Sequence, residues 1–493
     1  MKSADPLALA AARPRSSGRW LRRVLAAVPI LLVLGVVAAF ALRYWVEGFL
    51  RSDDFRRLLD RRASEALRAE GHFAPLHREG AGIFSASFDA ASGVGPLRKL
   101  TAEPIRAELN LRALLRRAWR VDEINLERVS VVLGDDAFSN LPRPDFQSKT
   151  DAASRPSPRP PESHGLTALL PSRFELGQVR VDQFALAWNP ARPEEAGALR
   201  DAALLAHPSG SSEFNADLHA WEIDGRGGKF TQARFPAVTL DTFHLKTTAT
   251  EIFITRADGR LDGGGTVALS GSQRLDGDRA LDLRITLADT PVTPFLPDDW
   301  RARLHGQLRA DVRIQGPADR PEQLRTSGHA ELRDGRLEAL PFLAELAVLT
   351  ATARYRQAPL QTGRADFAWS AGRLTVTNLQ VGSDGLLRIE GGFTVVNGQI
   401  DGTLQVGVAR NSAGGGLNRW LTGAAARVFD QPEHDGFAWT TMRVSGPANA
   451  PREDLSTRLL AAARDETVDK VRRTEGSVRD SARELLDFLR PSR

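Results

Sequence analysis

Residues 391–408 read GGFTVVNGQIDGTLQVGV, and this stretch decides the fold class. Asn397-Gly398 is the strongest short signal for a β-hairpin, because both central positions of a type I′ turn need a positive φ. A two-residue loop there would place Val395 opposite Ile400 and Phe393 opposite Gly402. Side chains alternate between the two faces of a strand, so one face of this hairpin is apolar and the other polar. The apolar face carries Phe393, Val395, Ile400, Leu404, Val406 and Val408.

The same alternation of apolar and polar residues recurs along much of the chain. Turn signals at Asp258-Gly259, Asp334-Gly335 and Asp384-Gly385 separate further strands, and Asn378 interrupts one alternation as a β-bulge would. Because the pattern is one-sided, we expect antiparallel strands with one solvated face. The sequence therefore predicts a mainly β protein, an elongated, groove-like antiparallel sheet. The residues expected to line its apolar groove are Leu281, Leu283, Ile285, Leu287, Leu304, Leu308, Val312, Ile314, Leu374, Val376, Phe393, Val395, Ile400, Leu404, Val406 and Val408.

Length and composition agree with this class. The chain has 493 residues, too many for one ordinary compact domain, so several domains or a repeating architecture are expected. Its 42 Gly and 28 Pro beside 42% hydrophobic residues indicate many strands and turns. Cysteine is absent, which excludes disulfides, thiolate metal sites and cysteine nucleophiles.

The basic charge of the chain is concentrated at its N-terminus. Six basic residues and one acidic residue fall in the first 23, so the remainder holds 60 of each sign. A nucleic-acid-binding protein needs a basic face that displaces counterions from phosphates. A neutral body behind a short basic tail argues against nucleic acid as a partner.

The segment 24–42, VLAAVPILLVLGVVAAFAL, predicts a transmembrane anchor, since it has about the length that spans the hydrocarbon core of a bilayer. The basic residues precede it, so the positive-inside rule places the N-terminus in the cytoplasm and the C-terminal body across the membrane. The alternative is a signal peptide cleaved after Ala41, although the apolar run exceeds the usual length of such a core. The anchor residues singled out are Val24, Ile30, Leu34, Val37, Phe40 and Leu42.

Three helices and one loop interrupt the strands. Residues 52–71 predict a helix that Ser52 caps and Gly71 ends, and residues 340–352 predict an apolar helix that flanks or fills the sheet. Residues 456–493 predict a charged amphipathic helix, solvated or docked on the body. The stretch 141–164 is rich in Pro and Ser and is expected to be a disordered loop.

Two internal echoes suggest a repeated unit. Residues 124–133, INLERVSVVL, match residues 179–188, VRVDQFALAW, roughly apolar for apolar with an acidic residue fourth in each, and VRIQGPADRPEQL at 312–324 resembles MRVSGPANAPREDL at 442–455. In the second pair a strand is expected to end at Gly-Pro-Ala, and a Pro to begin the next extended piece.

No motif carries recognisable catalytic chemistry. His72 and His77 are too widely spaced to share a helix face and lack the glutamate of a zinc-protease motif. Neither a GxSxG elbow nor a P-loop is present, so the sequence predicts no enzyme, no metal and no cofactor.

Taken together, the anchor, the helix that begins at SDDF (52–55) and the run IRAELNLRALLRRAWRVDEINLERVSVVL (105–133) resemble the N-terminal region of the AsmA-like family. Residues 335–404, from GRLEALPFLAELAVLTATARYRQ to GGFTVVNGQIDGTL, resemble the family's C-terminal region; residues 190–299 are only compatible in pattern. The resemblance implies a bacterial envelope protein, anchored in the inner membrane with a periplasmic body and similar to bridge-like lipid transfer proteins. The chain divides into a cytoplasmic tail (1–23), an anchor (24–45), an N-terminal AsmA-like helix and β region (46–140), a loop (141–164), a middle β-groove region (165–300), a C-terminal AsmA-like β-groove region (301–455) and a charged helix (456–493).

The function expected from the resemblance is to shield and conduct phospholipid between inner and outer membranes, with acyl chains in the groove, in support of outer-membrane biogenesis. The implied partners are phospholipid, the inner membrane and other envelope proteins. The main alternative is a non-catalytic scaffold for outer-membrane protein assembly with a protein-filled β core. Two further hypotheses are a secreted β-rich adhesin, which requires a cleaved anchor, and an enzyme built from polar residues of distant segments.

Overall fold

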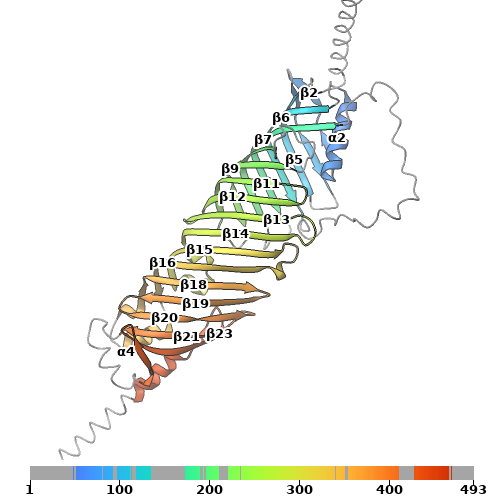
Figure 1. The fold of residues 1–493 in the computed structure, drawn as a ribbon. Helices are drawn as coiled ribbons and strands as arrows, with labels where there is room; N and C mark the ends of the chain where they lie inside the picture. Colours follow the sequence, from blue (N-terminus) through green and yellow to red (C-terminus); the bar gives the residue numbers. More distant parts are fainter. Residues whose placement is uncertain are drawn as a thin grey trace, which may run out of the picture.

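The fold was analysed in a computed structural model that describes residues 48, 52–79, 82–92, 97–110, 113, 118–134, 173–188, 193, 196–209, 220–233, 235–338, 340–349, 353–409, 427–465 and 468. These residues form one large sheet, mainly antiparallel, with few short helices, as the sequence predicted. Figure 1 shows the strands crossing the long axis of an elongated, twisted body, with α2 at one end and α4 at the other.

Most elements follow one another along the chain with short connections, and the longest connection separates β6 from β7. The first half contains α2 (Asp53–Leu67), β1 (Glu70–Phe73), β2 (Leu76–Glu79), β3 (Gly82–Ser85), β4 (Phe88–Ala91), β5 (Leu97–Leu109), β6 (Ala118–Leu133), β7 (Arg173–Trp188), β8 (Gly197–Pro208), β9 (Trp221–Arg226), β10 (Lys229–Gln232), β11 (Val238–Thr247) and β12 (Glu251–Leu261). The second half contains β13 (Thr266–Arg274), β14 (Ala280–Pro291), η3 (Thr293–Phe295), α3 (Asp298–Arg301), β15 (Leu304–Pro317), η4 (Pro321–Gln323), β16 (Arg325–Glu338), α4 (Pro341–Leu349), η5 (Ala353–Arg356), β17 (Gln357–Leu360), β18 (Thr362–Ser370), β19 (Arg373–Ser383), β20 (Leu387–Val396), β21 (Gln399–Ala409), β22 (Gln431–His434), β23 (Phe437–Pro447) and β24 (Arg452–Glu453).

The hairpin at Asn397-Gly398 is confirmed. Both residues have positive φ, 50° and 72°, and the register pairs Val395 with Ile400 and Phe393 with Gly402. The turn therefore sets which side chains of β20 and β21 share the apolar face.

Among the described strands one pair is parallel, whereas the sequence predicted an antiparallel sheet. β6 and β7 run in the same direction, with Ile124 beside Val179 and Val129 beside Phe184. The register reproduces the sequence similarity between residues 124–133 and 179–188. Each residue of 124–132 that the register pairs lies beside the residue 55 positions later in the chain. The long connection between the two strands permits a parallel arrangement that a short hairpin would forbid.

The three Asp-Gly signals have different outcomes. Asp384-Gly385 lies in the turn between β19 and β20, as predicted, whereas Asp258-Gly259 lies inside β12 and Asp334-Gly335 inside β16, so the turn predictions there were wrong. Asp334 has a φ of 49°, which a strand tolerates at a bulge. The bulge predicted at Asn378 is confirmed by its φ of 50° and by a register shift between Val376 and Leu379.

The helix α2 begins as predicted and ends earlier. The Ser52 hydroxyl accepts a hydrogen bond from the backbone N–H of Phe55, which satisfies one of the free donors of the first turn. The last helical residue is Leu67, and Arg68 takes the left-handed conformation, φ 50°, that was expected of Gly71. Gly71 instead pairs with Ala90 in the β1–β4 ladder, so tertiary pairing overrides its capping preference.

The other predicted helices lie at the C-terminal end. α4 falls within the predicted 340–352, and a further helix, which we call the terminal helix, begins at Leu455 and is described to residue 465, with residue 468 also helical. The predicted anchor at 24–42, the loop at 141–164 and the end of the chain beyond residue 468 lie outside the described residues. None of the described helices is long and apolar enough to span a membrane.

Candidate functional site

One line of side chains crosses nearly the whole sheet without a charged residue. We call it the central lane; directly paired residues of neighbouring strands point to the same face. Sixteen strand-to-strand steps at about 4.8 Å give it a length of roughly 75 Å. Its members are Ser85, Ile105, Leu126, Val181, Leu204, Gly225, Phe243, Ala257, Leu269, Ile285, Val312, Gly328, Phe367, Val376, Phe393, Gly402 and Val444.

A second line of pairs runs beside the central lane on the same face and is also uncharged. It follows the positions two residues away on most strands, so both lanes belong to one continuous apolar face. Its members are Ile83, Ala107, Ile124, Val179, Ala206, Ile223, Leu245, Ile254, Gly271, Leu283, Ile314, Thr326, Trp369, Leu374, Val395, Ile400 and Gly446.

The residues predicted to line a groove all occupy this apolar face. Most of them lie in the two lanes, and the register connects the rest to the same side, as in the pairs Leu287 with Ala310, Leu308 with Leu332 and Leu304 with Leu337. The prediction did not include the N-terminal half of the face, such as Val181, Leu204 and Phe243. Bulges interrupt the alternation of β7 and β11 there, so a period of two was not visible in the sequence.

The apolar face is covered at its two ends. At the N-terminal end Phe88, Ala102 and Val129 form a buried cluster on which Ala63 and Leu67 of α2 pack. At the C-terminal end Leu404, Val406 and Val408, predicted as groove lining, are buried in one cluster with side chains of α4 and of the terminal helix. These three side chains therefore contact the protein's own core.

Between the two ends most of the apolar face is only partly buried, although Phe243 is buried. Ile223, Leu245, Leu269, Ile285 and Ile314 all remain partly accessible to solvent, although none carries a polar group. The buried clusters around α2 and around α4 and the terminal helix include no side chain of β9 to β14 among the described residues. A face of aliphatic side chains that stays half-exposed is typical of a surface with an apolar partner.

The opposite face of the sheet is polar and held by cross-strand ion pairs. Arg313 Nη2 lies 2.6 Å from Asp282 Oδ2, and Lys246 Nζ lies 3.0 Å from Glu222 Oε1. Hydrogen bonding from Arg313 lowers the pKa of Asp282, and hydrogen bonding from Lys246 lowers the pKa of Glu222. These charges mark the polar face as the solvated one, because exposed ion pairs of this kind need no burial.

A histidine on the polar face has a shifted pKa. His329 Nδ1 lies 2.7 Å from Asp366 Oδ1, and this hydrogen bond raises the pKa of His329 above its ordinary value of 6.5. The pKa of Asp366 is lowered, first by the amide of Asn378 and then by His329. The stabilisation from His329 is complete below pH 6.5 and is lost as the pH rises through the folded-state pKa.

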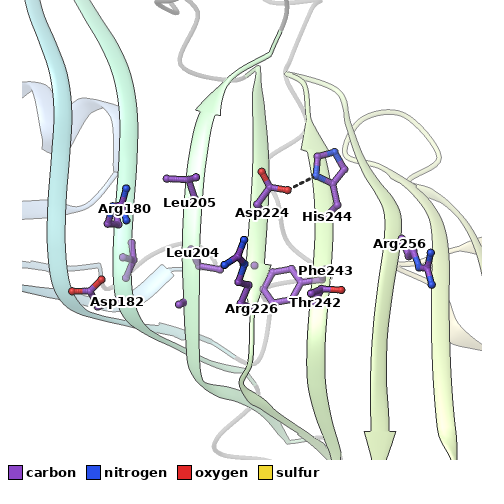
Figure 2. Close-up of a pocket in the computed structure, with 13 residues that line it drawn as sticks. Arg180, Asp182, Leu204, Leu205, Asp224, Arg226, Thr242, Phe243, His244 and Arg256 are labelled. Atoms are coloured by element: carbon purple, nitrogen blue, oxygen red, sulfur yellow. Dashed lines mark hydrogen bonds and ion pairs between the residues drawn. The ribbon is translucent and has the colours of Figure 1, made fainter.

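The polar face also contains a hollow of about 670 Å³ across β7, β8, β9, β11 and β12 (Figure 2). Its walls are polar-face residues, including Arg180, Asp182 and Arg256, and its floor is the backbone of the central lane. Figure 2 shows Asp224 turned toward His244, and their Oδ1 and Nδ1 atoms are 2.8 Å apart. This pair joins β9 to β11 across the strands, as Arg313–Asp282 and Lys246–Glu222 do elsewhere on this face. Among the described residues, no three His, Asp or Glu side chains group as a metal site.

The comparisons with known proteins leave the resemblance to the AsmA-like family a prediction. The chain matches no family model, no curated protein and no solved structure.

Proposed function

We propose that the protein is an inner-membrane-anchored periplasmic lipid carrier, in which the apolar face forms a trough for the acyl chains of phospholipid. The observation that carries the proposal is the uncharged central lane, whose side chains Leu269, Ile285 and Val312 stay partly exposed between its covered ends. Each methylene that leaves water for such a surface contributes about 0.8 kcal/mol. An acyl chain therefore gains enough to leave water, while its head group stays at the edge of the sheet.

The aliphatic nature of the lanes suits movement as well as binding. Leu269, Ile285 and Val312 follow one another on neighbouring strands with no polar group between them. Dispersion and hydrophobic contacts of this kind are non-directional, so each position along the lane offers a similar free energy. A lipid can shift from strand to strand without crossing a deep minimum, which fits transfer between inner and outer membranes in support of outer-membrane biogenesis.

The test is native mass spectrometry with lipid extraction on the full-length chain. The variant Val312→Lys/Ile314→Lys puts two charges on the apolar face of β15, and Thr375→Lys/Thr377→Lys puts two with the same spacing on the polar face of β19. We expect phospholipid to copurify with the natural chain and the control, and to be lost from the apolar-face variant. Equal lipid content in the two variants, both folded by circular dichroism, would show that the lipid lies elsewhere.

The second candidate function is a scaffold for outer-membrane assembly, and one observation favours it. The C-terminal part of the apolar face is filled by α4 and the terminal helix, as expected of a structural β core. A folded natural chain that carries no lipid would support the scaffold over the carrier.

A further inference from the structure

The terminal helix and α4 fill the C-terminal end of the apolar face completely. Leu343 and Leu346 of α4 and Leu455 and Leu459 of the terminal helix have no solvent exposure, and Val406 beneath them has none either. Side chains that are fully excluded from water leave no room for an acyl chain among them. We call α4 and the terminal helix together the stopper.

Arg458 ties the terminal helix to the sheet and to the segment before β22. Its Nη1 donates to the carbonyl oxygen of Thr441 at 2.6 Å, and its Nη2 donates to the Thr440 hydroxyl at 2.8 Å and to the carbonyl oxygen of Val428 at 3.1 Å. Hydrogen bonds from a charged donor are stronger than neutral ones. Arg458 therefore holds the stopper against β23 by polar contacts, in addition to the apolar burial of its neighbours.

The edge of the sheet is closed at the same place. β22 and β24 pair with the two ends of β23. Near β24, Asp454 makes two hydrogen bonds with the backbone of β23: Arg443 N–H donates to Asp454 Oδ1 at 2.8 Å, and Asp454 N–H donates to the Arg443 carbonyl oxygen at 3.2 Å. A free sheet edge exposes backbone N–H and C=O groups that can pair with another strand, whereas β23 is paired at both of its ends. The apolar face consequently does not continue onto a strand added beyond β23.

The two long rims of the sheet meet near the stopper. Trp300 lies between β14 and β15, and Ala448 lies between β23 and β24; the register places these connections at opposite ends of the strands. Trp300 Nε1 nevertheless donates to the Ala448 carbonyl at 3.2 Å. The sheet therefore curls so that one rim contacts the other. This contact narrows the lateral opening to the apolar face over the C-terminal third of the sheet.

The N-terminal end is also covered, by α2. The Ser64 hydroxyl accepts from Gly71 N–H at 2.9 Å and Asp60 Oδ1 accepts from Phe73 N–H at 2.8 Å, so α2 side chains satisfy the outer edge of β1. Among the described residues, the apolar face from β9 to β15 lies outside both helix-covered clusters, apart from Leu304 at the start of β15, which packs against the C-terminal one.

We propose that the trough is blind at its C-terminal end, where the stopper closes it, and that phospholipid enters and leaves sideways through the open stretch between β9 and β15. This inference rests on the proposed lipid-carrier function and specifies its route. Acyl chains lie on Leu269, Leu283 and Ile285 of β13 and β14, and the far end of the sheet is reached only when the stopper moves. The chain thus holds a limited stretch of lipid rather than acting as an open pipe.

Site-specific photocrosslinking in cells that express the full-length chain tests this route. A benzophenone amino acid replaces Ile285 in the open stretch, Arg284 beside it on the polar face, or Phe429, which is buried in the same cluster as the side chains of the stopper. After irradiation, lipid adducts are measured by mass spectrometry of the purified protein. We expect adducts at position 285 and only background at 284 and 429. In the background Arg458→Gln we expect adducts at 429 to rise roughly tenfold, since the loss of several hydrogen bonds favours the open stopper.

The outcomes separate the two levels of the proposal. Adducts at 429 as abundant as those at 285 in the otherwise natural chain would overturn the blind end and leave the lipid carrier standing. Absence of adducts at 285, 284 and 429 alike would overturn the lipid carrier itself. If Arg458→Gln leaves position 429 at background, Leu459→Asp, which places a charge beneath the terminal helix, serves as the second release variant. Adducts at 429 that stay at background in a folded Leu459→Asp chain would refute the stopper as the barrier.

Discussion

Truncation of one side chain of the terminal helix should loosen the C-terminal end without unfolding the rest of the sheet. Leu459 has no solvent exposure, whereas its neighbour Leu460 is 43% exposed, so Leu459→Ala and Leu460→Ala remove the same atoms from opposite environments. Leu459→Ala removes buried methyl groups and leaves a cavity, so it should lower the local free energy of unfolding by about 2–5 kcal/mol. The second should change stability by less than about 0.5 kcal/mol, as is usual for surface positions.

Hydrogen exchange measured by mass spectrometry is the suitable assay, because an elongated sheet opens locally rather than all at once. A loss of about 2–5 kcal/mol raises the population of the open end by roughly 30-fold to several thousand-fold. We expect this acceleration of exchange in peptides from β21 and β23, which contact the stopper, and none in β11 to β13. Equal effects of Leu459→Ala and Leu460→Ala, or equal acceleration in β11 to β13, would refute the stopper as a local, tightly packed unit.

Three further predictions concern the sheet. A Cβ atom on Gly225 would overlap the ring of Phe243, so Gly225→Ala should displace that ring and destabilise the protein by about 1–3 kcal/mol, measured as a fall in the melting temperature. Gly398 has a φ of 72° with open space around it, so Gly398→Ala should cost about 1 kcal/mol through strain alone; an unchanged melting temperature would contradict the type I′ turn. NMR titration should find the pKa of His329 above 6.5, and Asp366→Asn should bring it back toward that value; a pKa that ignores the substitution would exclude this ion pair in solution.

The parallel pair of β6 and β7 shows the limit of a repeat seen only in sequence. The echo between residues 124–133 and 179–188 indicated two similar strands, and the structure pairs them in the same register. The alternation of apolar and polar residues does not predict strand direction, since parallel and antiparallel strands both place every second side chain on one face. A long connection such as the one between β6 and β7 permits either direction, so the parallel pairing is a property of the tertiary structure.

The turn signals in the sequence differed in how well they predicted turns, because pairing with neighbouring strands can override a local preference. Asn397-Gly398 predicted its hairpin because both flanking strands alternate cleanly up to the turn. Asp258-Gly259 has the same type of residues yet continues β12, because its neighbours pair with β11 and β13 on both sides. The free energy of two ladders exceeds a local preference worth about 1 kcal/mol.

The fold class and the sidedness of the strands could be predicted without a structure, because the alternation with period two is a local property of each strand. All the predicted lining residues consequently share one face. Which of these residues remain accessible to solvent depends on the three-dimensional packing. Val406 and Ile285 occupy similar alternating patterns in the sequence. In the structure α4 and the terminal helix cover Val406, whereas Ile285 remains partly exposed. Coverage depends on contacts between segments far apart in the chain, and no local pattern encodes those.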